Sequence, residues 1–191
     1  LHEPLNDPET TYFGEIPDIE GIERWQFTSG DLQSEDFEEY RAARELLYDT
    51  LVRYIDEEIE CMFKEMTDME DTIVIITSDH GEEFWGYTEF EEANFRDSRE
   101  VYGVGHGHAL VPPVIEVPIA TNIQGLPLSE SRRSLTDIVP TLLTELGVDP
   151  PFEFDGYPLQ DASHADNPVL SQEIAYGPNQ ISVTEGDAHL I

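Results

Sequence analysis

The chain has 191 residues, of which 42 are acidic and only nine are basic, so its formal charge at pH 7 is −33. Long-range attraction to a polyanion is therefore excluded, and with it binding to nucleic acid or to an anionic membrane surface. Hydrophobic residues make up 39% of the chain and aromatic residues 10%, which is enough apolar surface to build a core and argues against a disordered chain.

Residues 1–33 are rich in Pro, Gly, Asp and Glu without a sustained period, which predicts a long surface loop. From residue 34 to residue 66, apolar side chains recur every three or four positions and acids fill the other face. This pattern predicts an amphipathic helix of about 30 residues. Ile73–Thr77 is an unbroken apolar run, typical of a strand covered on both faces. Residues 82–109 then form an excursion longer than an ordinary loop, which favours a functional role.

A second strand is predicted at Val114–Thr121, and a second helix opens at Thr136 and Asp137 and ends before Gly147. Three short strands close the chain, at Val169–Ile174, Ile181–Thr184 and His189–Ile191. The order of helix, strand, long loop, strand and helix indicates an α/β sheet. In such sheets, ligands gather outside the carboxyl ends of the strands.

The basic residues and the lone cysteine add two expectations. Eight of the nine basic residues are Arg and the ninth is Lys64, a composition that resembles proteins from salt-loving archaea; an acidic protein from a low-salt source is the alternative. Cys61 is the single cysteine, so an internal disulfide and a multi-cysteine zinc site are excluded, and its helical pattern predicts a half-buried thiol. No apolar run approaches the 18 or so residues of a membrane span.

Four side chains could carry chemistry. Asp79 and His80 directly follow the apolar strand, and Gly81 allows the backbone to turn so that both reach one site. A carboxylate and an imidazole offer a hard oxygen and a borderline nitrogen to a divalent cation; the alternative is a capping Asp and a His satisfied by hydrogen bonds. His106 and His108 stand between glycines, which let a backbone approach an anion or a metal, or else form an exposed loop.

Taken in order, six segments of the chain resemble the sulfatase family of the alkaline phosphatase superfamily. Ile73–Glu82 resembles the strand-plus-metal motif of that family. The other matching segments are His2–Leu5 (H-x-P-Y), Gly105–Leu110 (G-H-G-x-x-L), Val117–Ile119 (V-P-[LI]), Leu135–Leu143 (D-[IL]-x-P-T-[LI]-L) and Asp155–Leu159 (G-x-x-L).

The resemblance implies an α/β fold: an alkaline-phosphatase-like sandwich with a central mixed, mostly parallel sheet flanked by helices, present here in part. Residues 1–165 would be the C-terminal portion of the catalytic domain. Residues 166–191 would begin a small antiparallel C-terminal subdomain.

The resemblance also implies roles for individual residues. Asp79 and His80 would bind a divalent cation, with Ca²⁺, Mg²⁺, Mn²⁺ and Zn²⁺ all open. His106 would be catalytic and would contact the ester oxygens, and His108 would join it in binding the substrate. His2 would assist substrate binding or protonate the leaving group. The substrate would be a small-molecule or glycan ester of sulfate or phosphate.

The family's nucleophile, a formylglycine made in a C/S-x-P-x-R motif, has no counterpart in these residues, nor do the first aspartates of its metal site. With Leu1 rather than Met at its start, the chain is expected to be the C-terminal portion of a metal-dependent sulfate ester hydrolase, inactive without the missing N-terminal part. His80 in place of Asn after Asp79 leaves open a phosphodiester or phosphonate hydrolase, or a phosphoryl-group transferase, of the same superfamily. A non-catalytic relative is the third alternative.

Overall fold

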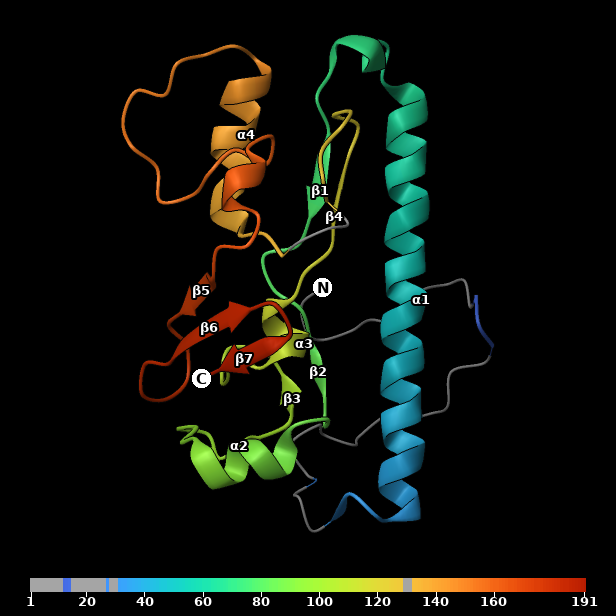
Figure 1. The fold of residues 1–191 in the computed structure, drawn as a ribbon. Helices are drawn as coiled ribbons and strands as arrows, with labels where there is room; N and C mark the ends of the chain where they lie inside the picture. The colour runs from blue at the N-terminus through green and yellow to red at the C-terminus, as the bar shows by residue number, and fades with distance from the viewer. Residues whose placement is uncertain (1–11, 15–26, 28–30, 129–131) are drawn as a thin grey trace.

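The computed structural model describes residues 12–14, 27, 31–128 and 132–191 (Figure 1). His2 and most of the loop predicted for residues 1–33 lie outside them. The first long element is helix α1, Glu35–Glu65, which confirms the predicted amphipathic helix. Ser34 caps it, because its side chain accepts a hydrogen bond from the Phe37 N–H at 3.2 Å and satisfies a donor that has no partner within the helix.

The two central strands are short. β1, Ile75–Thr77, pairs antiparallel with β4, Ile119–Thr121, and Ile76 lies opposite Ala120. The strand predicted at Val114–Thr121 therefore starts too early. Its first residues belong to the helical turn α3, Pro112–Ile115, in which the prolines occupy the first helical positions where a missing N–H costs nothing.

The excursion at residues 82–109 is an ordered structure. Strand β2, Glu83–Phe84, pairs antiparallel with β3, Val104–Gly105, and helix α2, Thr88–Asn94, lies between them in the chain. Glu83 is directly opposite Gly105 in this two-stranded ribbon. This register decides which polar side chains of the two strands meet.

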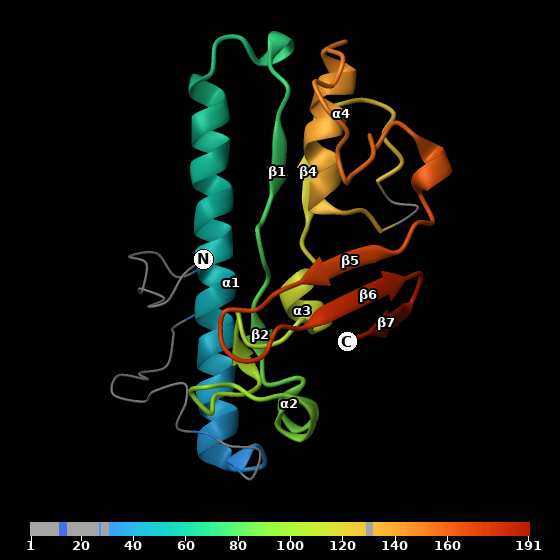
Figure 2. The ribbon, with the colours of Figure 1, turned by 90° about the vertical axis from the view of Figure 1, so that its left-hand side faces the viewer.

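Helix α4, Ile138–Glu145, follows the short 3₁₀ turn Leu135–Asp137, which a reciprocal capping box between Ser134 and Asp137 opens. Figures 1 and 2 show β1 and β4 between α1 and α4. Three consecutive antiparallel strands close the chain, confirming the predicted C-terminal hairpin and the strand before it. They are β5, Val169–Gln172, β6, Ile181–Glu185, and β7, Ala188–Leu190. Two further 3₁₀ turns lie at Met69–Asp71 and Ala162–His164.

Three expectations change. The chain does combine helices with strands, but every strand pair among the described residues is antiparallel, and no mostly parallel central sheet is present there. β1 is not covered on both faces: Ile76 is 37% exposed, and Val139 on α4 is 49% exposed. Cys61 is exposed on α1 rather than half-buried. No helix in the part of the chain that the structure describes is long and apolar enough to cross a membrane.

An aromatic core holds the excursion against α1. The Trp85 ring meets Phe37 edge-on, with ring centroids 5.2 Å apart, and lies 5.8 Å from Tyr40. All three side chains are at most 4% exposed, and Val104 of β3 completes the cluster. Because edge-to-face aromatic pairs are favourable beyond the area they bury, this cluster anchors the β2–β3 ribbon at a defined place on the helix.

Candidate functional site

A cleft of about 900 Å³ opens where β1 ends. Asp79, His80 and His106 contribute polar side chains to its lining, and Arg132 and Arg133, which precede α4, contribute the positive ones. Segments of α3, β4 and the C-terminal sheet complete the wall. The cleft therefore lies beyond the carboxyl end of a strand, where an α/β fold is expected to bind its ligands.

Gly81 fixes the course of the chain at the cleft. Its N–H donates to the Val114 carbonyl at 2.7 Å, which ties the residues after β1 to α3. A Cβ added at Gly81 would lie only 2.0 Å from the Pro113 carbonyl oxygen. Only glycine allows the two backbones to approach so closely, and this approach sets the position of Asp79 and His80.

His80 is held in the tautomer that suits a metal ligand. Its Nδ1 lies 2.8 Å from the Gly81 carbonyl oxygen, which can only accept, so Nδ1 carries the proton and Nε2 has a lone pair. Nε2 is 3.7 Å from Asp79 Oδ1, and the Asp79 side chain is 81% exposed. Tetrahedral ligands at about 2.0–2.1 Å from zinc lie about 3.4 Å apart, so this pair is spaced to share one cation.

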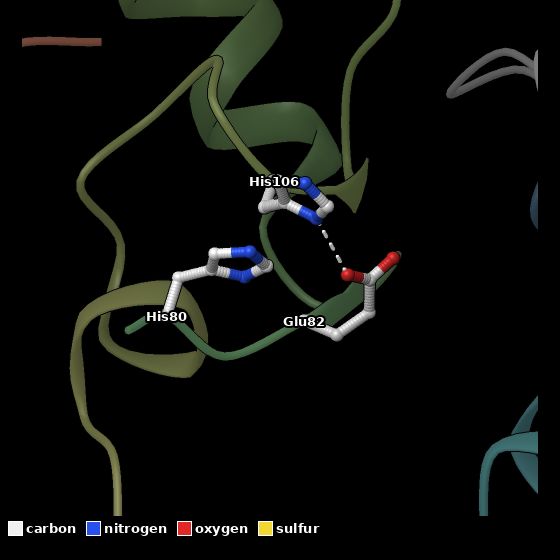
Figure 3. Close-up of side chains that lie close together, drawn as sticks. All are labelled: His80, Glu82 and His106. Carbon is white, nitrogen blue, oxygen red and sulfur yellow. Dashed lines mark hydrogen bonds and ion pairs between the residues drawn. The ribbon is translucent and has the colours of Figure 1, made fainter. Parts of the chain in front are cut away.

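His106 stands next to His80 and is oriented by Glu82 (Figure 3). The His106 Nδ1–H donates to Glu82 Oε2 at 2.8 Å, and the two imidazole rings stack with centroids 3.9 Å apart. Ligand atoms of His80, Glu82 and His106 all lie within 4.8 Å of one another. A carboxylate that accepts a hydrogen bond from one nitrogen of an imidazole fixes the tautomer of that ring and orients its second nitrogen, as in many metal and catalytic sites.

The strand register explains why these three residues meet. Glu83 is opposite Gly105, so the preceding Glu82 comes opposite the following His106. His80 lies two residues before Glu82, and side chains two apart in an extended segment point to the same side. The spacing of His80 and Glu82 is visible in the sequence, whereas their pairing with His106 depends on the register of the ribbon.

His108 does not share the cleft with His106. Its side chain is 1% exposed and lies with the buried carboxylates of Glu83 and Glu91, 3.8 Å and 3.1 Å from its Nε2. His106 and His108 were both expected to bind the substrate, but of the two only His106 lines the cleft. Glu83 and Glu82 are neighbours and point to opposite sides, so the excursion carries one histidine–carboxylate set at the cleft and another in its interior.

The interior set has perturbed ionisation. Burial lowers the pKa of His108, but the two facing carboxylates outweigh burial and raise the pKa to about 9. Burial raises the pKa of Glu83 to about 7, with the neighbouring Glu91 adding to the effect and His108 opposing it. The interior set thus favours a positive charge between the two acids.

Reasoning from the sequence did not select five residues of these two regions: Glu82, Glu83, Glu91, Arg132 and Arg133. Glu91 lies on α2, eight positions from Glu83, a separation with no periodic meaning between two different elements. Arg132 and Arg133 stand outside every recognised motif. The scarcity of basic residues was the one signal available, because two adjacent arginines are conspicuous in a chain with nine basic residues.

Comparison with known proteins gives one match. The family model described as Sulfatase matches residues 18–148, a stretch that contains α1, the whole of the excursion and α4. Asp79, His80 and His106 all fall within it. Searches of curated proteins and of solved structures returned no match.

Proposed function

This chain belongs to the sulfatase family, and from that premise we propose that it carries part of the metal and substrate site of a hydrolase of sulfate esters. The observation that carries the proposal is the convergence of Asp79, His80 and His106 on one cleft, with the His80 lone pair 3.7 Å from the Asp79 carboxylate. Family membership alone does not name residues, and this convergence supports the choice of these three.

The donor set fits a divalent cation. Asp79 and His80 would hold it, as the tautomer of His80 and the spacing of the two ligand atoms favour. Such a cation would polarise the ester and offset the negative charge that gathers on the transferring group.

His106 has a separate role in this proposal. The Glu82 carboxylate accepts its Nδ1–H and so orients the ring, whose Nε2 would contact an ester oxygen or the departing alcohol. Glu82 therefore acts through His106 as a positioning residue. His2, outside the described residues, keeps its proposed role near the leaving group.

The two arginines favour an anionic substrate. Arg132 pairs with Glu116, and its Nε donates to the Gly186 carbonyl at 3.0 Å, so its guanidinium is held at the cleft. Arg133 Nε and Nη2 are buried and make no hydrogen bond to any described residue. A sulfate or phosphate oxygen would satisfy these donors with charge-assisted bonds.

We propose that the nucleophile comes from sequence beyond these 191 residues, as does the rest of a mostly parallel sheet. The exposed apolar side chains of Ile76 and Val139 support this division, because such a sheet would cover them. In the same proposal, residues 1–165 belong to the catalytic domain, and residues 166–191, which contain the β5–β6–β7 sheet, begin the C-terminal subdomain.

A phosphodiester or phosphonate hydrolase, or a phosphoryl-group transferase, is the second candidate. The His80 imidazole beside the Asp79 carboxylate gives the donor set a nitrogen ligand, which favours manganese or zinc over calcium. His80 in place of Asn points the same way.

The test uses the full-length protein and isothermal calorimetry with Mn²⁺, Zn²⁺ and Ca²⁺. Asp79→Ala should abolish binding at the cleft, whereas Asp71→Ala, an exposed acid before the same strand, should leave it unchanged. Turnover of an aryl sulfate against an aryl phosphodiester then separates the two candidates. Unchanged metal affinity in Asp79→Ala would show that the site is misassigned.

A further inference from the structure

We propose that Glu83, Glu91 and His108 form a second metal site, buried inside the excursion, which takes Zn²⁺ or Mn²⁺ and fastens β2, α2 and the segment after β3 together. The proposal concerns residues other than those of the cleft and does not depend on the reaction proposed above. It rests on three properties of the cluster: its geometry, its unsatisfied polar atoms and its charge.

The geometry is that of a small coordination sphere. The three residues come from three different parts of the excursion, and their side chains are at most 1% exposed. One ligand atom from each lies within 4.8 Å of the others, and His108 Nε2 is 3.1 Å from Glu91 Oε2 and 3.8 Å from Glu83 Oε2. Tetrahedral ligands at about 2.0–2.2 Å from a zinc ion lie about 3.3–3.6 Å apart, close to the two distances from His108.

Polar atoms in the cluster are left without hydrogen bonds. Glu83 Oε2, Glu91 Oε1 and both ring nitrogens of His108 are buried and have no hydrogen-bond partner among the described residues. His108 Nε2 approaches Glu91 closely, but not along a hydrogen-bond direction. Unpaired buried polar groups are costly and rare in native proteins, so a group of them in one place indicates a missing ligand.

The remaining carboxylate oxygens are already used in a way that orients the acids. Glu83 Oε1 accepts the Tyr87 N–H at 2.7 Å, and Glu91 Oε2 accepts the Gly103 N–H at 2.5 Å. Each carboxylate is therefore held by a backbone N–H near it, in the way that outer hydrogen bonds orient the ligands of established metal sites.

Charge favours a divalent cation in particular. Two carboxylates and a neutral imidazole carry −2, which a divalent ion cancels. Without a metal ion, the cluster can lower this charge only by taking up protons on His108 and on Glu83, whose pKa burial raises. One nitrogen and two carboxylate ligands suit zinc or manganese, whereas calcium prefers oxygen ligands alone.

The test measures metal content in the full chain. The protein is unfolded in denaturant with EDTA, refolded with Zn²⁺ or Mn²⁺, desalted and analysed by mass spectrometry. His80→Ala disables the cleft site, so that variant should still retain one equivalent of metal. Adding Glu91→Gln should remove it, whereas adding Glu89→Gln, an exposed acid on the same helix, should not.

Thermal melting gives the second readout. Zn²⁺ should raise the melting temperature of His80→Ala, with or without Glu89→Gln, and should have no effect once Glu91→Gln is present. His80→Ala without bound metal would overturn the proposal, and this result stands even where the Glu91 variant fails to fold. Equal metal content with and without Glu91→Gln would overturn it as well. Neither result bears on the metal site at the cleft, because His80→Ala disables that site in all these variants.

Discussion

Replacing Gly81 by alanine tests how the fold positions the cleft. The added Cβ would lie 2.0 Å from the Pro113 carbonyl oxygen, where ordinary contact begins at 3.4 Å. The segment after β1 and the α3 turn must therefore move apart by more than an ångström. That movement breaks the 2.7 Å bond from the Gly81 N–H to the Val114 carbonyl.

The expected loss of stability follows from these two effects. Forcing an extra methyl into a closed contact costs about 1–3 kcal/mol, and the lost hydrogen bond about 0.5–1.5 kcal/mol. Together they lower the free energy of unfolding by about 2–4 kcal/mol. For a chain of this size each kcal/mol corresponds to about 2–4 °C, so the melting temperature should fall by about 5–15 °C.

Thermal melting followed by circular dichroism compares Gly81→Ala with a control variant and with the parent. Gly86→Ala is the matched control, because Gly86 has a negative φ and a Cβ there meets nothing within 4 Å. It should be neutral or slightly stabilising, since alanine restricts the unfolded chain. If Gly81→Ala melts within a degree of the parent, the close approach does not constrain the site, and the account of how Asp79 and His80 are placed is wrong.

Three further predictions follow from the ionisable groups. The metal-free chain should lose stability as pH rises, because His108, with a folded pKa of about 9 against 6.5, contributes fully below 6.5 and loses that contribution as the pH passes about 9. Glu83 has a pKa of about 7 in the folded chain against 4.5 in the unfolded chain, so its contribution to stability is also lost as the pH rises, between about 4.5 and 7. Melting temperatures that rise with pH across the two ranges would contradict the assignment. Glu82→Gln should lower turnover of the full-length protein by about 10–100-fold and leave metal affinity in calorimetry unchanged, because His106 loses its orienting carboxylate while Asp79 and His80 stay intact. A loss of metal affinity would contradict the separate role given to His106. Melting temperature should climb steeply with KCl up to molar concentration, since the charge of −33 is then screened; a flat profile would refute the halophilic interpretation.

Elements with a strong local signal were predictable from the sequence. Helix α1 has a cap at Ser34 and an apolar stripe, and both act within the helix itself, so its extent was predicted closely. The strand at Val114–Thr121 was misjudged because apolar composition does not separate a short strand from a helical turn opened by two prolines. The order of strands was harder still, because pairing depends on contacts distant in sequence.

The residues of the site differ in the same way, because some are marked by local sequence and others only by contacts distant in sequence. Asp79 and His80 are neighbours at a strand end, and the sequence is sufficient to nominate them. The separation of His106 from His108 was not predictable, because both stand in one glycine-rich run and only the surrounding chain decides where each side chain goes. Glu91 could be found only from the folded position of α2.

The register of the β2–β3 ribbon connects the two histidine–carboxylate sets. Glu82 and Glu83 are adjacent, so one must face the cleft histidine while the other faces the interior. A slip by one residue would exchange them, so that Glu83 would face His106 and Glu82 would face the interior. The packing of Trp85, two residues after Glu83, against Phe37 and Tyr40 opposes that slip, because the slip would expel a buried indole. An aromatic contact with α1 therefore determines which carboxylate orients His106, and weakening that contact should disturb the cleft without changing any residue in it.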